Sequence, residues 1–290
     1  MTSPMVLWMS VAGVVCLAWG GFVARKDVAA APGLDKLTAL ACVLFAAPLA
    51  VFGAEHLTNA GDIVPLIPAW MPARLFWAYF VGVALIAAAL SLSVKKYLRL
   101  TGTLLAVMFF LFVLLMHIPG VIESPRDRFT WAIALRDLSF GSGALALAGA
   151  MTPAPRRSNG AVNVARIFIG MVMIVYAVEH FLHPAFAPGV PLKKMTPAWV
   201  PLPHLWAYAT GAVLLIGGIA ILMNRYTRDA AVWAGLWIVL LTLCFYVPIL
   251  AMARGTMEIV VGLNYVFDTL LFGGTILLLA EAASANLSWR

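Results

Sequence analysis

The sequence predicts an all-α polytopic membrane protein of about nine transmembrane helices: one N-terminal helix followed by two parallel-repeat four-helix bundles. Composition is the first observation, because 63% of the 290 residues are apolar and only 11% are charged. A soluble domain carries about 25% charged residues, so this chain has too little polar material to cover a surface in water. The second observation is a series of apolar runs, each near the roughly 20 residues that cross a bilayer. The third is a set of polar motifs that recurs in the second half of the chain.

Nine apolar runs, separated by charged or Pro/Gly-rich segments, define the predicted spans. No connection between them is long enough to hold an ordinary soluble domain. The runs cover about residues 5–24, 37–57, 75–94, 100–118, 129–150, 164–183, 204–223, 230–252 and 259–281. We therefore expect an N-terminal transmembrane helix with a cytoplasmic loop over residues 1–36. A first four-helix unit should follow over residues 37–150, and a second over residues 151–290.

The first span is expected to be a retained helix, although Ala29-Ala30-Ala31 resembles a signal-peptide cleavage site. A secretory signal carries its positive charge before the apolar run, whereas here Arg25 and Lys26 follow it. The basic residues lie singly or in pairs between spans, so the net charge of +7 indicates orientation in a lipid bilayer and no nucleic-acid partner. One side of the membrane receives about twice as many Lys and Arg as the other. This bias predicts an outside N-terminus and a cytoplasmic C-terminus.

An internal repeat organises the rest of the chain. Polar and aromatic motifs of the first unit recur 124 to 131 residues later, in the same order. The pairs are Glu55-His56 and Glu179-His180, Ala69-Trp70-x-Pro72 and Ala198-Trp199-x-Pro201, Trp77-Ala78-Tyr79 and Trp206-Ala207-Tyr208, and Asp137 and Asp268. Each unit has four spans, an even number, so both enter the membrane in the same direction. The repeats are therefore expected to be related by a pseudo-twofold axis along the membrane normal.

This topology brings the charged and histidine residues to one depth, in the outer half of each bundle. A charge in the bilayer costs about 2.5–3.5 kcal/mol on insertion scales, so such residues usually pair with one another or line a cavity. The candidate catalytic residues end the first helix of each unit and are Glu55, His56, Glu179 and His180. The candidate cofactor-binding residues are His117, Arg136, Asp137, His183, Tyr208 and Asp268.

The two polar clusters are chemically unequal. Arg136 corresponds to the apolar Phe267, and His117 corresponds to Tyr246. Counting Glu55, Asp137, Glu179 and Asp268 against Arg136 leaves an excess of three negative charges, which protonated histidines, neutral carboxyls or a bound cation must offset. One cluster is therefore expected to be active and the other structural.

Three interpretations of the Glu-His pairs stay open. The side chains can hydrogen-bond helices together near the membrane interface. They can bind a redox ligand, with histidines that donate to a quinone headgroup or ligate haem or a metal. The carboxylates can instead form a proton or ion pathway. No dedicated metal site is predicted, because the sequence has no H-x-x-E-H or similarly dense spacing.

Two four-helix units, each with Glu-His at the outer end of its first helix, an A-W-x-P loop and a W-A-Y opening its second helix, resemble the DoxX-like family of membrane proteins. The resemblance covers about residues 37–282 as two tandem copies. Members of that family include a membrane subunit of a thiosulfate:quinone oxidoreductase, and related proteins assist the maturation of periplasmic redox enzymes. The resemblance implies a bacterial inner-membrane location, quinone as a cofactor, and other membrane or periplasmic redox subunits as partners. The chain departs from single-unit members in its duplication and in having no cysteine motif, which leaves the substrate unassigned.

We therefore expect an integral membrane subunit or accessory protein of a redox complex, quinone-linked, with a polar site in the outer half of the bundle. In this hypothesis Arg136 pairs with a carboxylate and a histidine donates to a quinone oxygen or carries its proton. The alternatives are a non-catalytic membrane scaffold or assembly factor and a small-molecule or ion transporter.

Overall fold

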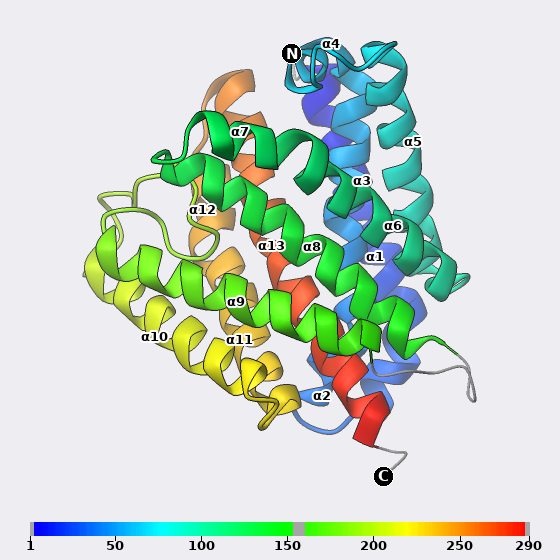
Figure 1. Ribbon diagram of the computed structural model, residues 1–290, viewed down its shortest axis with the longest axis vertical. Helices are drawn as coiled ribbons and strands as arrows, with labels where there is room; N and C mark the ends of the chain where they lie inside the picture. The colour runs from blue at the N-terminus through cyan, green and yellow to red at the C-terminus, as the bar shows by residue number, and fades with distance from the viewer. Residues whose placement is uncertain (1–2, 153–159, 288–290) are drawn as a thin grey trace.

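The computed structural model describes residues 3–152 and 160–287, which fold into helices without any β-strand in these ranges (Figure 1). The N-terminal segment and the first unit contain α1 (Pro4–Ala30), α2 (Asp35–Ala39), α3 (Ala41–Thr58), α4 (Ala60–Ile63), α5 (Arg74–Ser93), α6 (Leu98–Phe112), α7 (Ile118–Glu123) and α8 (Arg128–Ala150). The second unit contains α9 (Gly160–Leu182), α10 (Pro203–Leu222), α11 (Thr227–Leu241), α12 (Val247–Ala251) and α13 (Gly255–Leu287). The prediction of an all-α polytopic membrane protein is confirmed.

Eight helical segments of the described residues are long and apolar enough to cross a membrane. They correspond to all the predicted spans except 129–150, which is α8. This helix has 23 residues and so the length to span, but Arg136, Asp137 and several glycines and serines make it more polar. It packs against α6, α9 and α13, so neighbouring helices shelter its polar side chains from lipid.

Backbone irregularities recur at matched positions of the two units. Non-glycine residues with left-handed backbone occur in three pairs, each 129 residues apart: Ala73 and Leu202, Lys95 and Asn224, and Tyr97 and Tyr226. A π-helical turn ends α6 at Val113–His117 and another ends α11 at Thr242–Tyr246. Each turn comes just before a proline, whose ring clashes with a preceding carbonyl in a regular helix, and the wider turn relieves that clash. Left-handed backbone costs about 1–2 kcal/mol per residue, so its recurrence supports the internal repeat.

The two units are interlocked. Within each unit the first and second helices pack together, as do the third and fourth (α3 with α5, α6 with α8, α9 with α10, α11 with α13). The fourth helix of each unit then packs against the first helix of the other, which pairs α8 with α9 and α13 with α3. The two fourth helices also pack on each other, and α13 lies behind α8 in Figure 1. In α13, 89% of the most apolar window is buried, compared with 22% to 67% in the other seven candidate spans.

Glycines let the central helices approach closely. A Cβ on Gly143 of α8 would lie 3.0 Å from the Cα of Thr275 on α13, and a Cβ on Gly274 of α13 would lie 2.8 Å from the backbone nitrogen of Phe45 on α3. Helices in lipid gain no hydrophobic free energy from associating, so close packing of this kind carries much of their association. The interlock therefore depends on small residues in α8 and α13.

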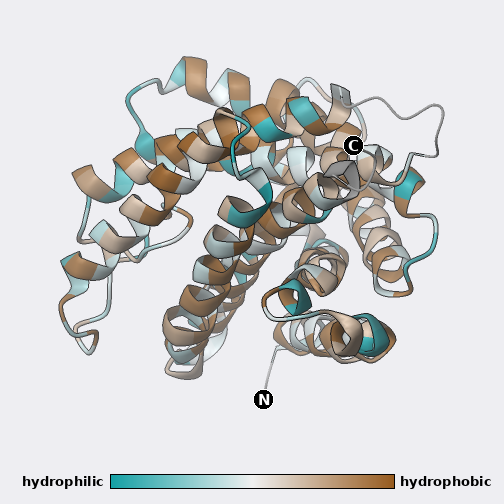
Figure 2. Ribbon diagram, turned by 90° about the horizontal axis from the view of Figure 1, so that it is seen from below, coloured by the Kyte–Doolittle hydropathy of each residue, from teal (hydrophilic) through white to brown (hydrophobic). Residues whose placement is uncertain are grey.

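The two ends of the molecule differ in their connections. Figure 1 places the start of α1, α4 and α7 at one end, here called the outer end, and α2 with the end of α13 at the other. At that opposite end, Asp35 forms an ion pair with Arg228 of the second unit, and Lys95 pairs with Asp27 of α1 at 2.5 Å. Figure 2 shows apolar residues along most of the helices and hydrophilic ones mainly at helix ends and connections. This distribution suits helices that face lipid over their length.

Candidate functional site

Polar residues from both units meet in one place, here called the buried charge centre: His117, Arg136, Asp137 and Asp268. Arg136 Nε donates to Asp137 Oδ1 at 3.1 Å, and Arg136 Nη1 donates to Asp268 Oδ2 at 2.9 Å. The second oxygen of Asp137 lies 2.8 Å from His117 Nε2. One guanidinium thus joins the two aspartates that the repeat relates, so the units share a centre instead of holding one cluster each.

The position of His117 follows from the local sequence. The π-helical turn Val113–His117 precedes Pro119 and packs against α8. The His117 side chain is 17% exposed, whereas its partner Asp137 is buried. The neighbouring Leu114 and Ile118 are exposed. The Arg136 side chain is 21% exposed, so His117 and Arg136 are the two members of the centre that reach toward the surface.

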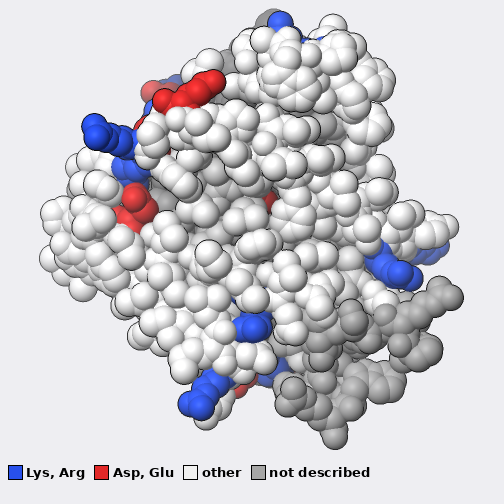
Figure 3. Space-filling model, in the orientation of Figure 1, with Lys and Arg blue, Asp and Glu red and all other residues white. Residues whose placement is uncertain are grey.

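The surface around the centre carries almost no charge. Figure 3 shows that most of this face is uncharged, with charged residues at the upper left, the right edge and the lower part, and one small acidic patch near the middle. Asp137 and Asp268 are each only 6% exposed. Buried charges are tolerated only when partners compensate the lost hydration, which the shared guanidinium does here.

A second link between the units involves Glu55 at the outer end of α3. Asn264 Nδ2 of α13 donates to Glu55 Oε1 at 3.1 Å. The amide oxygen of Asn264 is buried and has no hydrogen-bond partner among the described residues. The partner of Glu55 from the other unit is therefore a neutral amide, and the Asn264 side-chain oxygen remains free to accept a hydrogen bond.

A third link involves Glu179 of α9. Arg128, the first residue of α8, donates from Nε to Glu179 Oε2 at 2.7 Å, and its guanidinium lies 4.4 Å from the centroid of the Phe186 ring. His183 Nε2 is 3.9 Å from the same carboxylate oxygen. Arg128 was not among the predicted site residues, because the packing of α8 on α9 that brings it to Glu179 could not be predicted from the sequence. With Arg128 included, the excess of three negative charges falls to two.

The two histidines of the Glu-His pairs bond to their own helices. His56 Nδ1 lies 2.8 Å from the carbonyl oxygen of Phe52, and His180 Nδ1 lies 2.5 Å from that of Tyr176. The other His180 nitrogen accepts a hydrogen bond from the backbone N–H of Gly189 at 2.9 Å. Both ring nitrogens of His180 are thus engaged by backbone groups, so a ligand would have to displace one of these bonds.

Tyr208 lies away from the buried charge centre. Its side chain is 44% exposed and stacks on Phe181, with ring centroids 6.4 Å apart. Tyr176 and Tyr246 occupy the interior instead, and their hydroxyls donate to the carbonyl oxygens of Ala132 and Pro188. The structure brings together Glu55, His117, Arg136, Asp137 and Asp268 across the interface of the units and leaves Tyr208 outside that group.

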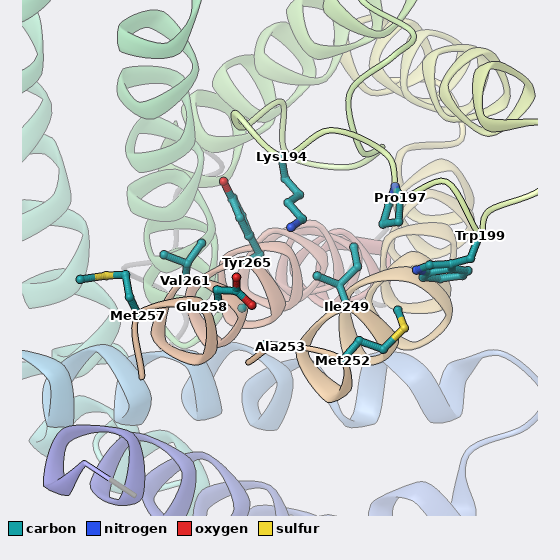
Figure 4. A pocket seen from close by; sticks show the side chains of 11 residues that line it. Lys194, Pro197, Trp199, Ile249, Met252, Ala253, Met257, Glu258, Val261 and Tyr265 are labelled. Atoms are coloured by element: carbon teal, nitrogen blue, oxygen red, sulfur yellow. The ribbon is translucent and has the colours of Figure 1, made fainter. Parts of the chain in front are cut away.

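A cavity of about 330 Å³, here called the outer pocket, opens between the α9–α10 connection, α12 and the start of α13 (Figure 4). Its walls include Trp199 and Ile249, and its polar groups come from Lys194, Glu258 and Tyr265. None of these residues was predicted to belong to a site. Trp199 was visible only as part of the repeated A-W-x-P motif, and nothing in the sequence linked Lys194 to Glu258.

The described residues contain no group of three or more His, Cys, Asp or Glu side chains placed to hold a metal ion. Cys16, Cys42 and Cys244 are not bonded to each other. The outer pocket has the volume to hold part of an organic ligand, and the partly exposed His117 offers a polar contact beside lipid.

Comparison with known families separates the two units. Residues 161–248 match the DoxX family, and residues 45–136 match a domain of unknown function (DUF8561). The resemblance to DoxX-like proteins is thus confirmed for the second unit. No curated protein and no solved structure matches the chain.

Proposed function

Because residues 161–248 form a DoxX domain in a multi-pass membrane protein, we propose that the chain is a quinone-linked membrane subunit of a redox complex. The observation that carries this proposal is the surroundings of His117. Its Nε2 bonds to Asp137, its Nδ1 has no hydrogen-bond partner among the described residues, and Leu114 and Ile118 beside it are exposed. A lipid-soluble headgroup with a carbonyl or hydroxyl oxygen can reach such a histidine from the bilayer.

The chemistry at His117 is proton transfer. His117 Nδ1 would hold a quinone or quinol oxygen and would take up or supply the proton that accompanies quinone redox chemistry, while Nε2 stays bonded to Asp137. The Asp137 carboxylate orients the ring and stabilises the imidazolium through a charge-assisted hydrogen bond. Arg136 fixes that carboxylate from its other side. The proposal also requires a partner subunit on the outer side of an inner membrane, which donates electrons to the quinone or accepts them from the quinol.

Quinone extraction and binding test the proposal. We expect lipid extracts of the purified protein to contain quinone, and a short-chain quinone analogue to bind the protein in detergent. His117→Asn should weaken binding roughly tenfold through the loss of one hydrogen bond to the ligand. The exposed His204 at the start of α10 provides the control, because His204→Asn changes no residue of the centre. Equal binding by the two variants, or no binding by the unmodified chain, would contradict the proposal.

A scaffold role is the second candidate, and one observation favours it. Arg136 with Asp268, Arg128 with Glu179, and Asn264 with Glu55 all join one unit to the other. A scaffold would lose thermal stability when these links are broken, and no ligand-dependent signal would change. The transporter alternative needs rocking of one unit against the other, and such motion would disrupt the packing of α8 on α9 and of α13 on α3.

A further inference from the structure

Two opposite charges face the outer pocket without meeting. Lys194 extends from the α9–α10 connection toward α13, on which Glu258 lies (Figure 4). The Lys194 ammonium has neither an ion-pair nor a hydrogen-bond partner in residues 3–152 and 160–287. Glu258 Oε2 accepts the backbone N–H of Arg254 at 2.8 Å, and its Oε1 has no partner in the same ranges. Two unpaired, opposite charges on one cavity fit a ligand that carries both charges itself.

The walls of the outer pocket fit a molecule at the membrane interface. Trp199 and Tyr265 supply aromatic surface, and tryptophan and tyrosine favour the headgroup level of a bilayer. Met252, Met257 and Val261 also line the pocket and are exposed. Because this rim is apolar and open, acyl chains can leave the pocket along it into lipid.

The chemistry of the outer pocket is not shared by the first unit. Pro65 occupies the position equivalent to Lys194, and Ala134 occupies that of Tyr265. Asp127, the counterpart of Glu258, caps α8 by accepting hydrogen bonds from the backbone of the next turn. The pocket therefore belongs to the second unit and is not a by-product of the repeat.

We propose that the outer pocket binds a zwitterionic phosphoethanolamine headgroup, as carried by phosphatidylethanolamine in the outer half of the bilayer. Lys194 binds a phosphate oxygen, and Glu258 Oε1 accepts a hydrogen bond from the primary ammonium. A phosphocholine headgroup has no N–H to donate to Glu258. An anionic phosphoglycerol headgroup supplies no cation for it.

Native mass spectrometry of the full chain in detergent tests this assignment. Phosphatidylethanolamine, phosphatidylcholine and phosphatidylglycerol with identical acyl chains are titrated separately. We expect the first lipid to bind roughly tenfold more tightly than the other two. Lys194→Gln and Glu258→Gln should each remove that preference, because each deletes one charge-assisted contact.

Matched controls lie close by. Lys193→Gln removes a lysine whose ammonium lies over the Phe129 ring at 4.4 Å, and Glu123→Gln removes an exposed acid at the outer end of the first unit. Both controls should retain the preference, and thermal melting checks that all four variants fold. Soluble glycerophosphoethanolamine should displace the lipid if the headgroup is what the pocket recognises.

Three results would overturn the proposal. Equal affinity for the three lipids would show that no headgroup is recognised. Phosphatidylglycerol binding that equals phosphatidylethanolamine binding and depends on Lys194 alone would make the pocket an anion site. An unchanged preference in both Lys194→Gln and Glu258→Gln would place the recognised lipid elsewhere on the protein.

Discussion

Arg136→Gln measures how strongly the buried charge centre holds the two units together. The substitution removes a guanidinium that bonds Asp137 at 3.1 Å and Asp268 at 2.9 Å, and both carboxylates are 6% exposed. Removing one partner of a buried ion pair costs about 3–5 kcal/mol, because an uncompensated charge stays behind. One guanidinium serves two carboxylates here, so we expect the free energy of unfolding to fall by at least about 3 kcal/mol.

A second substitution should restore part of this loss. Arg136→Gln combined with Asp268→Asn also removes one stranded carboxylate and leaves Asp137 paired with His117. The double variant should therefore be more stable than Arg136→Gln alone. Unfolding by titration of a denaturing detergent into mild micelles gives the free energies. A loss below about 1 kcal/mol for Arg136→Gln, or a double variant less stable than the single one, would refute the charge-balance argument.

Three further outcomes are expected. Gly274→Ala should lower the free energy of unfolding by about 1–3 kcal/mol, because its Cβ would meet the Phe45 backbone at 2.8 Å, whereas Gly21→Ala, with open space around it, should not destabilise the protein. The hydroxyl of Thr130 lowers the pKa of Asp127. The stability that the ionised Asp127 cap contributes is therefore fully present above the usual carboxyl pKa of about 3.9. It is lost as the pH falls through the lowered pKa. Melting temperature should therefore fall more steeply with acidification in the unmodified chain than in Asp127→Asn, whose amide still caps α8. Reporters fused to the two ends should be active on opposite sides of the membrane, the C-terminal one in the cytoplasm; activity of both on one side would contradict the orientation.

The helices and their order could be predicted from the sequence, because each apolar run has the length that the bilayer demands. The repeat was also readable, since Glu55-His56 and Glu179-His180 stand at matching helix ends. The packing of each fourth helix against the first helix of the other unit could not be predicted. The apolar composition of a helix indicates that the helix faces lipid or protein. It does not indicate which helix is its neighbour, because lipid and helix surfaces are equally apolar.

The candidate site was predicted in its residue types more than in its arrangement. Arg136 was expected to pair with a carboxylate, and it pairs with Asp137 and also with Asp268 of the other unit. The ion pair between Arg128 and Glu179 was not predicted. Arg128 is the first residue of α8, and from the sequence alone such a residue cannot be distinguished from a charged residue of the preceding loop. His180 looked like a ligand by its type, yet its backbone contacts engage both ring nitrogens.

Division of the chain between Thr152 and Gly160 tests the interlock as a whole. The fourth helix of each unit is buried against the other unit, so residues 1–152 and 160–290 expressed together should associate and purify as one complex. The second piece alone would leave Asp268 without Arg136 and the α8-binding face of α9 without a partner, so it should not accumulate as a stable monomer. Arg136→Gln in the first piece should reduce recovery of the complex, whereas Arg99→Gln, at an exposed position near the end opposite the outer end, should not. Two pieces that fold separately and never associate would mean that each unit completes its own bundle, and the shared centre would lose its structural basis.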